Sequence, residues 1–137
     1  MNKINFLKES LKSLKTSGTL FPSSRFLASK LLKGIDFSTA KLIVEFGPGN
    51  GVITKEILKR LQPDAKLISF EINETFYKDL LKIEDPRFIV SKQSADKVQE
   101  VIKQHGFTTT DYIVSSLPLT NIPKSIIDFT FFSFSTA

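Results

Sequence analysis

The chain has 137 residues, 41% of them hydrophobic, which predicts one domain large enough to bury a core. It has no cysteine, which excludes disulfides, thiolate metal sites and cysteine nucleophiles, and its one histidine, His105, argues against a histidine-built metal site or triad. No apolar run is long enough to span a bilayer, and the N-terminus lacks the apolar core of a signal peptide. We therefore expect a soluble, cytoplasmic protein.

The net charge of +5 is concentrated at the N-terminus. Residues 1–33 carry seven basic side chains against one acidic one, Glu9, whereas the other 104 residues carry twelve basic and thirteen acidic side chains. The seven are Lys3, Lys8, Lys12, Lys15, Arg25, Lys30 and Lys33. Such a segment suits a polyanion, either an acidic membrane surface or a nucleic acid backbone.

Residues 3–15 have the pattern of a basic amphipathic helix. Its apolar residues recur at helical spacing, with lysines between them: Ile4, Leu7, Leu11 and Leu14. This helix could lie on a membrane, or it could pack its leucines on the domain and leave its lysines in water. A second short helix is expected to run through Leu32 and to stop at Gly34. We therefore expect an N-terminal helical segment over residues 1–34.

From residue 41 apolar runs alternate with helical patterns, which predicts a second unit over residues 35–137. The expected elements are a strand at 41–46, a helix at about 51–61, a strand at 66–72, a helix from the Asn73 cap to about 83, a strand at 87–91, a helix at about 95–104 and a strand at 111–115. Four strands joined by three helices predict a doubly wound parallel sheet of the α/β class. Right-handed crossovers place the first strand centrally, with a ligand across the carboxyl ends of the first strands.

The segment Glu45-Phe46-Gly47-Pro48-Gly49-Asn50-Gly51 connects the first expected strand to the first helix. Glycines allow the backbone to turn tightly and to approach a ligand that a Cβ would exclude, and the start of a helix offers free N–H groups. The segment therefore predicts a nucleotide-binding loop, with the spacing GxGxG in place of the GxGxxG of dinucleotide enzymes. A plain strand-to-helix turn is the alternative.

Glu71 ends the second expected strand, where an acidic side chain of a doubly wound sheet can accept hydrogen bonds from both hydroxyls of a ribose. Glu71 could also be no more than a solvated strand end. The strand, the loop, the helix, the next strand and the acid occur in the order that a nucleotide pocket needs. This combination favours a bound nucleotide-like ligand.

These residues resemble the phospholipid N-methyltransferases, which are related to the ribosomal RNA adenine dimethylases within the class I S-adenosylmethionine-dependent methyltransferases. The resemblance covers about residues 5–127. It rests on four segments: Ser17-Gly18-Thr19-Leu20-Phe21-Pro22-Ser23-Ser24-Arg25, Glu45 to Gly51, Phe70-Glu71-Ile72-Asn73, and Ser115-Ser116-Leu117-Pro118-Leu119-Thr120-Asn121-Ile122-Pro123. It implies a Rossmann-like domain that binds S-adenosyl-L-methionine.

The resemblance also implies roles for individual residues. Glu45 and the three glycines of the loop would hold the amino acid part of the cofactor, Glu71 the ribose hydroxyls, and Ile72 the face of the adenine. Asp96 would accept from the adenine amino group, or it could be a first-turn carboxylate favoured by the helix dipole. The full expected cofactor-binding set is Glu45, Phe46, Gly47, Pro48, Gly49, Gly51, Glu71, Ile72, Asp96 and Ser115. No metal is expected.

The segment Ser116-Leu117-Pro118-Leu119 bears on the methyl acceptor. Adenine dimethylases commonly have Asn-Leu-Pro-Tyr there, where the amide orients the target amine and the aromatic ring stacks on a flipped base. Leu119 offers no stacking surface and Ser116 no amide, which favours a phospholipid head-group amine such as that of phosphatidylethanolamine over RNA. Ser116 and the carbonyls around Leu117 and Pro118 are the expected amine orienters, although a tight turn is the alternative for Ser116. A lipid substrate would also favour peripheral membrane contact through the basic helix.

The phenylalanine-rich tail, Ile126 to Phe134, fits neither the helical nor the strand period. In the resembled family the sheet continues with further strands beyond this segment, so we expect a truncated chain whose fourth strand is an exposed edge. Truncation leaves open a cofactor-binding module without turnover. A nicotinamide oxidoreductase is a third alternative, which the GxGxG spacing weakens.

Overall fold

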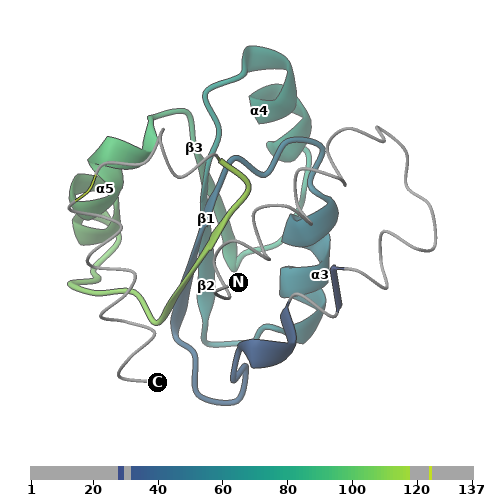
Figure 1. Cartoon of the computed structure of the whole chain (residues 1–137), viewed down its shortest axis with the longest axis vertical. Helices are drawn as coiled ribbons and strands as arrows, with labels where there is room; N and C mark the ends of the chain where they lie inside the picture. The colour runs from purple at the N-terminus through teal and green to yellow at the C-terminus, as the bar shows by residue number, and fades with distance from the viewer. Residues whose placement is uncertain (1–27, 30–31, 118–123, 125–137) are drawn as a thin grey trace.

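The computed structural model describes residues 28–29, 32–117 and 124. Within them, short helical turns and three α-helices alternate with four strands (Figure 1). In chain order the elements are η1 (Leu32–Gly34), β1 (Leu42–Phe46), α3 (Val52–Arg60), β2 (Lys66–Phe70), α4 (Glu74–Leu80), β3 (Phe88–Ser91), η2 (Ala95–Lys97), α5 (Val98–Gln104) and β4 (Tyr112–Ser115). The prediction of a doubly wound α/β fold is confirmed.

The four strands form one parallel sheet in the order β3-β2-β1-β4. β1 is central, as expected, because it pairs with β2 on one side and with β4 on the other. Val44 lies opposite Ile68 of β2 and Ile113 of β4. The direction of winding therefore reverses between β1 and β4, and a doubly wound sheet binds its ligands at the carboxyl ends of the strands beside such a reversal.

The sheet separates two hydrophobic clusters, because successive side chains of a strand point to opposite faces. Ile43 and Leu67 pack with Ile57 of α3 on one face, whereas Val44 packs with Ile102 of α5 on the other. Figure 1 shows α3 and α4 on one side of the sheet and α5 on the opposite side. The sheet is thus covered on both faces, which explains why β1 is buried along its whole length.

The described residues of the expected N-terminal segment pack on the α3 face. Ala28 and Ser29 are helical, and both Ala28 and Leu32 are buried in the cluster beneath α3. Arg60, at the end of α3, donates a hydrogen bond to the Ser29 hydroxyl. The expected helix at 3–15 lies outside the described residues, and so does the phenylalanine-rich tail.

Besides β2, which ends at Phe70 instead of residue 72, two helices differ from the sequence-based expectation. The helix expected at 95–104 begins as the 3-10 turn η2 and becomes α-helical only at Val98. The helix after Asn73 ends at Leu80 instead of about residue 83, although its start is as expected, since the Asn73 side chain accepts from the Phe76 N–H at 3.0 Å. Both differences are confined to helix ends, where turn geometry and tertiary contacts decide the boundary.

An ion pair at the amino-terminal edge of the sheet joins β3 to the end of α3. The Arg87 guanidinium donates to the carbonyl of Leu58 at 2.8 Å and to that of Leu61, and it pairs with the Asp85 carboxylate at 2.7 Å. Two carbonyls at the end of a helix thereby gain a cationic partner. The hydrogen bonds from Arg87 hold the pKa of Asp85 below its ordinary value of 3.8.

This ion pair predicts acid sensitivity. A carboxyl whose folded pKa is depressed stabilises the fold above its unfolded pKa, and the contribution disappears as the pH falls through the folded pKa. We expect the free energy of unfolding to fall as the pH drops below about 4, and Asp85→Asn to make this dependence shallower while lowering stability at pH 7. Urea unfolding across this pH range checks it, with Glu84→Gln as an exposed control. An unchanged slope in Asp85→Asn would contradict the assignment.

Candidate functional site

The candidate site lies at the carboxyl ends of β1, β2 and β4, and Phe46 connects the three. The carbonyl of Phe46 accepts from the Ser116 N–H at 2.9 Å, just beyond β4. Its ring meets that of Phe70 of β2 edge to face, with the centroids 5.6 Å apart. The Gly47 N–H in turn donates to the carbonyl of Phe70 at 3.0 Å. These contacts fix where the three strands end and where the loop after β1 begins.

The loop after β1 depends on glycine. Gly47, Gly49 and Gly51 have φ of 66°, 57° and 85°, in the left-handed region that side chains with a Cβ rarely adopt. Gly51 caps α3: its N–H donates to the carbonyl of Pro48 at 3.0 Å, and its own carbonyl accepts from the Lys55 N–H at 3.0 Å. The expected loop is therefore present, and its conformation explains the glycine at each of the three positions.

Glu71 follows β2 and reaches back to this loop. Its Oε1 accepts from the Gly49 N–H at 2.9 Å, and its Oε2 accepts from the Asn73 N–H at 3.1 Å. Glu71 is only 7% exposed. Its backbone N–H donates a hydrogen bond to the carbonyl of Ser91 of β3. Glu71 therefore is not the solvated strand end that was one alternative.

Glu45 lies inside the fold, completely buried beneath the loop. Its Oε1 accepts from the Thr54 hydroxyl at 2.6 Å and from the Ser69 hydroxyl at 2.7 Å. Thr54 belongs to the first turn of α3, and Ser69 lies opposite Glu45 in the β1–β2 register. Because the carboxylate is enclosed, any hold on a ligand would be indirect, through the positions of the loop and of α3. The expected role of Glu45 in holding the amino acid part of a cofactor stays a prediction.

Sequence reasoning did not find Thr54 and Ser69. A signal existed for Ser69, because a serine within the apolar run of β2 must find a hydrogen-bond partner once it is buried. Thr54 had a weaker signal, its place one turn into the helix that follows the glycines. Their common partner became visible only when the register of β1 and β2 was known.

Two further expected residues lie after β2 and β3. Ile72 is 67% exposed next to Glu71, so it presents an apolar surface beside the carboxylate. Asp96 is in the first turn of η2, is exposed, and accepts a hydrogen bond from the Ser94 hydroxyl. This position matches the first-turn carboxylate that was the alternative for Asp96, and its contact with an adenine stays a prediction.

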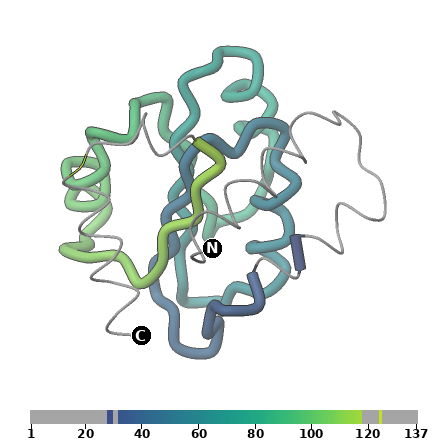
Figure 2. Tube along the Cα trace, in the orientation of Figure 1, coloured from purple at the N-terminus to yellow at the C-terminus, as the bar shows by residue number. Residues whose placement is uncertain are grey.

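The residues after β4 form a turn held by a side chain. The Ser115 hydroxyl accepts from the Leu117 N–H at 3.1 Å, and Leu117 packs against the hydrophobic cluster on the α5 face. Figure 2 shows this stretch beside β1, to which Ser116 is bound through its backbone N–H. The turn that was the alternative for Ser116 is thus present, and the hydroxyl of Ser116 as an amine orienter stays a prediction. Pro118 lies outside the described residues.

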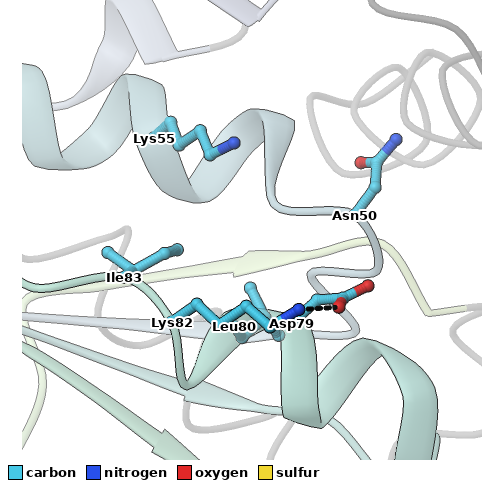
Figure 3. A pocket seen from close by; sticks show the side chains of 6 residues that line it. All are labelled: Asn50, Lys55, Asp79, Leu80, Lys82 and Ile83. Carbon is cyan, nitrogen blue, oxygen red and sulfur yellow. Dashed lines mark hydrogen bonds and ion pairs between the residues drawn. The ribbon is translucent and has the colours of Figure 1, made fainter.

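A hollow of about 470 Å³ opens on the other side of the loop, between α3 and α4. Figure 3 shows its lining: Asn50, Lys55, Asp79, Leu80, Lys82 and Ile83. Asp79 pairs with Lys82, three residues further along the chain, at 3.3 Å. Asn50 belongs to the predicted loop, but no residue of the expected cofactor-binding set lines the hollow.

Among the described residues no group of histidine and carboxylate side chains could hold a metal ion. The same part of the chain contains no helix that is both long and apolar enough to cross a bilayer.

Solved structures with a similar fold identify the fold class. The O-methyltransferase TomG from Streptomyces achromogenes, solved with S-adenosylmethionine, has a TM-score of 0.62 over 96% of this chain and 60% of its own, at 13% identity. An O-methyltransferase from Bacillus cereus, solved with S-adenosylhomocysteine, has a TM-score of 0.62 over 96% and 62%, at 18% identity. These likenesses show that the chain has the class I methyltransferase fold.

Sequence similarity points to the same class. Over 123 residues the chain is 30% identical to an ornithine lipid N-methyltransferase of Singulisphaera acidiphila, which covers 88% of this chain and 64% of that protein. It is 25% identical over 128 residues to ribosomal RNA small subunit methyltransferase A of Mycoplasma mycoides subsp. mycoides, covering 82% and 47%. No family model matches the sequence. The chain thus has the class I methyltransferase fold and is similar in sequence to methyltransferases named for a lipid and for ribosomal RNA. It spans about half to two thirds of the length of these relatives.

Proposed function

We propose that the protein binds S-adenosyl-L-methionine and transfers its methyl group to an amine of a lipid head group. The cofactor fits what the site offers. The glycine loop brings bare backbone to the end of β1, Glu71 offers carboxylate oxygens at the end of β2, and Ile72 presents an apolar surface beside them. These are the features that a ribose with an attached adenine needs from a doubly wound sheet. The GxGxG spacing disfavours the alternative of a nicotinamide cofactor, oxidised or reduced.

When bound, S-adenosyl-L-methionine supplies an activated methyl group, so the protein has to position the acceptor more than activate it. Glu71 would accept hydrogen bonds from the ribose hydroxyls, and Ile72 would cover the adenine. Ser116 is held by its N–H to the end of β1. Its hydroxyl and the carbonyls around Leu117 and Pro118 would orient the acceptor amine by accepting hydrogen bonds from it. Alignment with the methyl group and exclusion of water then account for the rate.

The observation that carries the lipid assignment is the similarity to the ornithine lipid N-methyltransferase over 88% of the chain. The sequence Ser-Leu-Pro-Leu at 116–119 supports it, because these residues offer neither an amide nor an aromatic ring to a flipped base. The positive charge of residues 1–33 would attract the chain to an acidic lipid surface. Ornithine lipid and phosphatidylethanolamine both present a primary amine, and both are candidate acceptors.

Methylation of ribosomal RNA is the second candidate, because the similarity to methyltransferase A covers 82% of the chain. The same basic segment would suit an RNA backbone. Adenine dimethylation requires the target base to leave its stack and to be held by stacking and hydrogen bonds. The missing aromatic side chain at position 119 therefore makes RNA the weaker candidate.

Methyl transfer from labelled S-adenosylmethionine distinguishes lipid methylation from RNA methylation. We expect the purified protein to label vesicles that contain ornithine lipid or phosphatidylethanolamine, and to leave phosphatidylcholine vesicles and 30S ribosomal particles unlabelled. Phosphatidylcholine is the matched control because its amine is already fully methylated. Label in the RNA with none in the lipids would refute the lipid assignment. Binding of S-adenosylhomocysteine with no transfer to any acceptor would indicate a cofactor-binding module.

A further inference from the structure

We propose that Glu71 also acts as a positioning residue, which holds the glycine loop in its binding conformation before any ligand arrives. The inference rests on the proposed function only where a cofactor is used as the probe. Its basis is the hydrogen bond from the Gly49 N–H to Glu71 Oε1, at 2.9 Å between buried groups. This bond joins the middle of the loop to the end of the neighbouring strand.

The carboxylate is well placed to hold another segment, because it is itself fixed. The Glu71 N–H is bound to the carbonyl of Ser91 of β3 at 2.9 Å, and its Oε2 accepts from the Asn73 N–H, where α4 begins. Its backbone and one oxygen are thus bound to β3 and to the cap of α4. A loop that is hydrogen-bonded to the Glu71 carboxylate is therefore held in a fixed position relative to the sheet.

The glycine loop needs such a stabilising hydrogen bond. Gly49 has φ of 57°, and glycine loses more conformational freedom on ordering than any other residue, so an ordered glycine loop has a high entropic cost. A bond from a backbone N–H to a carboxylate is stronger than one between neutral groups, and a buried N–H without a partner is costly. Glu71 therefore favours one loop conformation over the many that three glycines allow.

Holding the loop does not prevent Glu71 from binding a ribose. An ionised carboxylate has about four lone-pair positions on its two oxygens. In this structure Gly49 and Asn73 each use one, on different oxygens. Within the described part of the chain one position is thus left on each oxygen, which matches two neighbouring hydroxyls. The same carboxylate can thus hold the loop and the sugar together.

The first test needs no ligand. In the ligand-free protein, amide hydrogen exchange followed by NMR is expected to be about tenfold faster at Gly49 in Glu71→Ala than in the wild type. Glu71→Gln keeps one acceptor oxygen and should give an intermediate rate, while Glu84→Ala, an exposed control, should change nothing. Amides of β1 should keep their protection in every variant, which shows that the fold is intact. Equal exchange at Gly49 in Glu71→Ala and the wild type would overturn the proposal. If Glu71→Ala does not fold, Glu71→Gln decides alone.

The second test uses S-adenosylhomocysteine and its 2′,3′-dideoxy analogue in calorimetry. If Glu71 touched only the ribose hydroxyls, Glu71→Ala and the wild type would bind the dideoxy analogue equally, and that result would count against the proposal. We expect Glu71→Ala to bind the analogue about tenfold more weakly as well, because its loop is no longer held. If the wild type binds neither compound, the proposed function fails, whereas the exchange result still decides whether Glu71 holds the loop.

Discussion

Replacing Glu45 with alanine is expected to lower the free energy of unfolding by about 3 kcal/mol, the largest effect of any substitution in the site. The substitution removes the acceptor of two buried hydroxyls, those of Thr54 and Ser69, and leaves a cavity between β1, β2 and α3. A buried polar group that loses its partner costs more than the net contribution of the bond. Because the first turn of α3 is one of the groups released, binding of S-adenosylhomocysteine should weaken too.

Urea unfolding and calorimetry of three variants check this. Glu45→Gln keeps the shape and one acceptor oxygen, so it should cost less than half as much as Glu45→Ala. Ser69→Ala removes one of the two donors, at about 1 kcal/mol. A Glu45→Ala protein as stable as the wild type would show that the carboxylate does not join the strands to the helix. If Glu45→Ala instead lost ligand binding at unchanged stability, a direct contact with the ligand would be supported.

Replacing Gly51 with alanine is expected to cost about 2 kcal/mol of stability and to weaken S-adenosylhomocysteine binding. Two causes add. The residue has φ of 85°, which a Cβ disfavours, and its Cβ would lie 3.2 Å from Cδ2 of Leu80, a buried side chain on α4. Leu80 also lines the hollow of Figure 3, so a shift of its side chain would move the contact between α3 and α4.

The chain provides a matched control for this substitution. Gly106 has nearly the same φ, 86°, but a Cβ there would meet nothing within 4 Å. Gly106→Ala should therefore show the backbone cost alone, about 1 kcal/mol, with ligand binding unchanged. The difference between the two variants in thermal unfolding measures the contact with Leu80. Equal losses in both would mean that Leu80 moves aside freely, and equal ligand affinity would mean that the loop tolerates the added methyl group.

Most of the fold could be predicted from the sequence, because the signals were local. Continuous apolar runs marked the buried parallel strands, Asn73 marked the start of α4, and the alternation of strands and helices placed β1 at the centre. The glycine loop and Glu71 were found for the same reason, as each stands at the end of a strand. The helix ends near residues 83 and 95 were wrong by a few residues, since local propensity fixes boundaries poorly.

The remaining features depend on contacts between distant residues. Glu45 is enclosed because the hydroxyls of Thr54 on α3 and Ser69 on β2 donate hydrogen bonds to it. These contacts become visible only when the register of β1 and β2 is known. That Glu71 reaches the Gly49 N–H follows from the path of the loop, which glycines leave open in the sequence. Patterns in a sequence indicate which residues lie near the site but not which of them bind one another.

The central place of β1 also sets the order in which the domain can assemble. Val44 pairs with Ile68, 24 residues away, but with Ile113 only across 69 residues. Closing the longer loop costs about 1 kcal/mol more in chain entropy, and long-range parallel pairing is slow. β1, β2 and β3 can therefore meet before β4 joins them. The half of the site that would hold the cofactor would then form first, and the turn at Ser116, which would face the acceptor, would be the last part in place and the first to open.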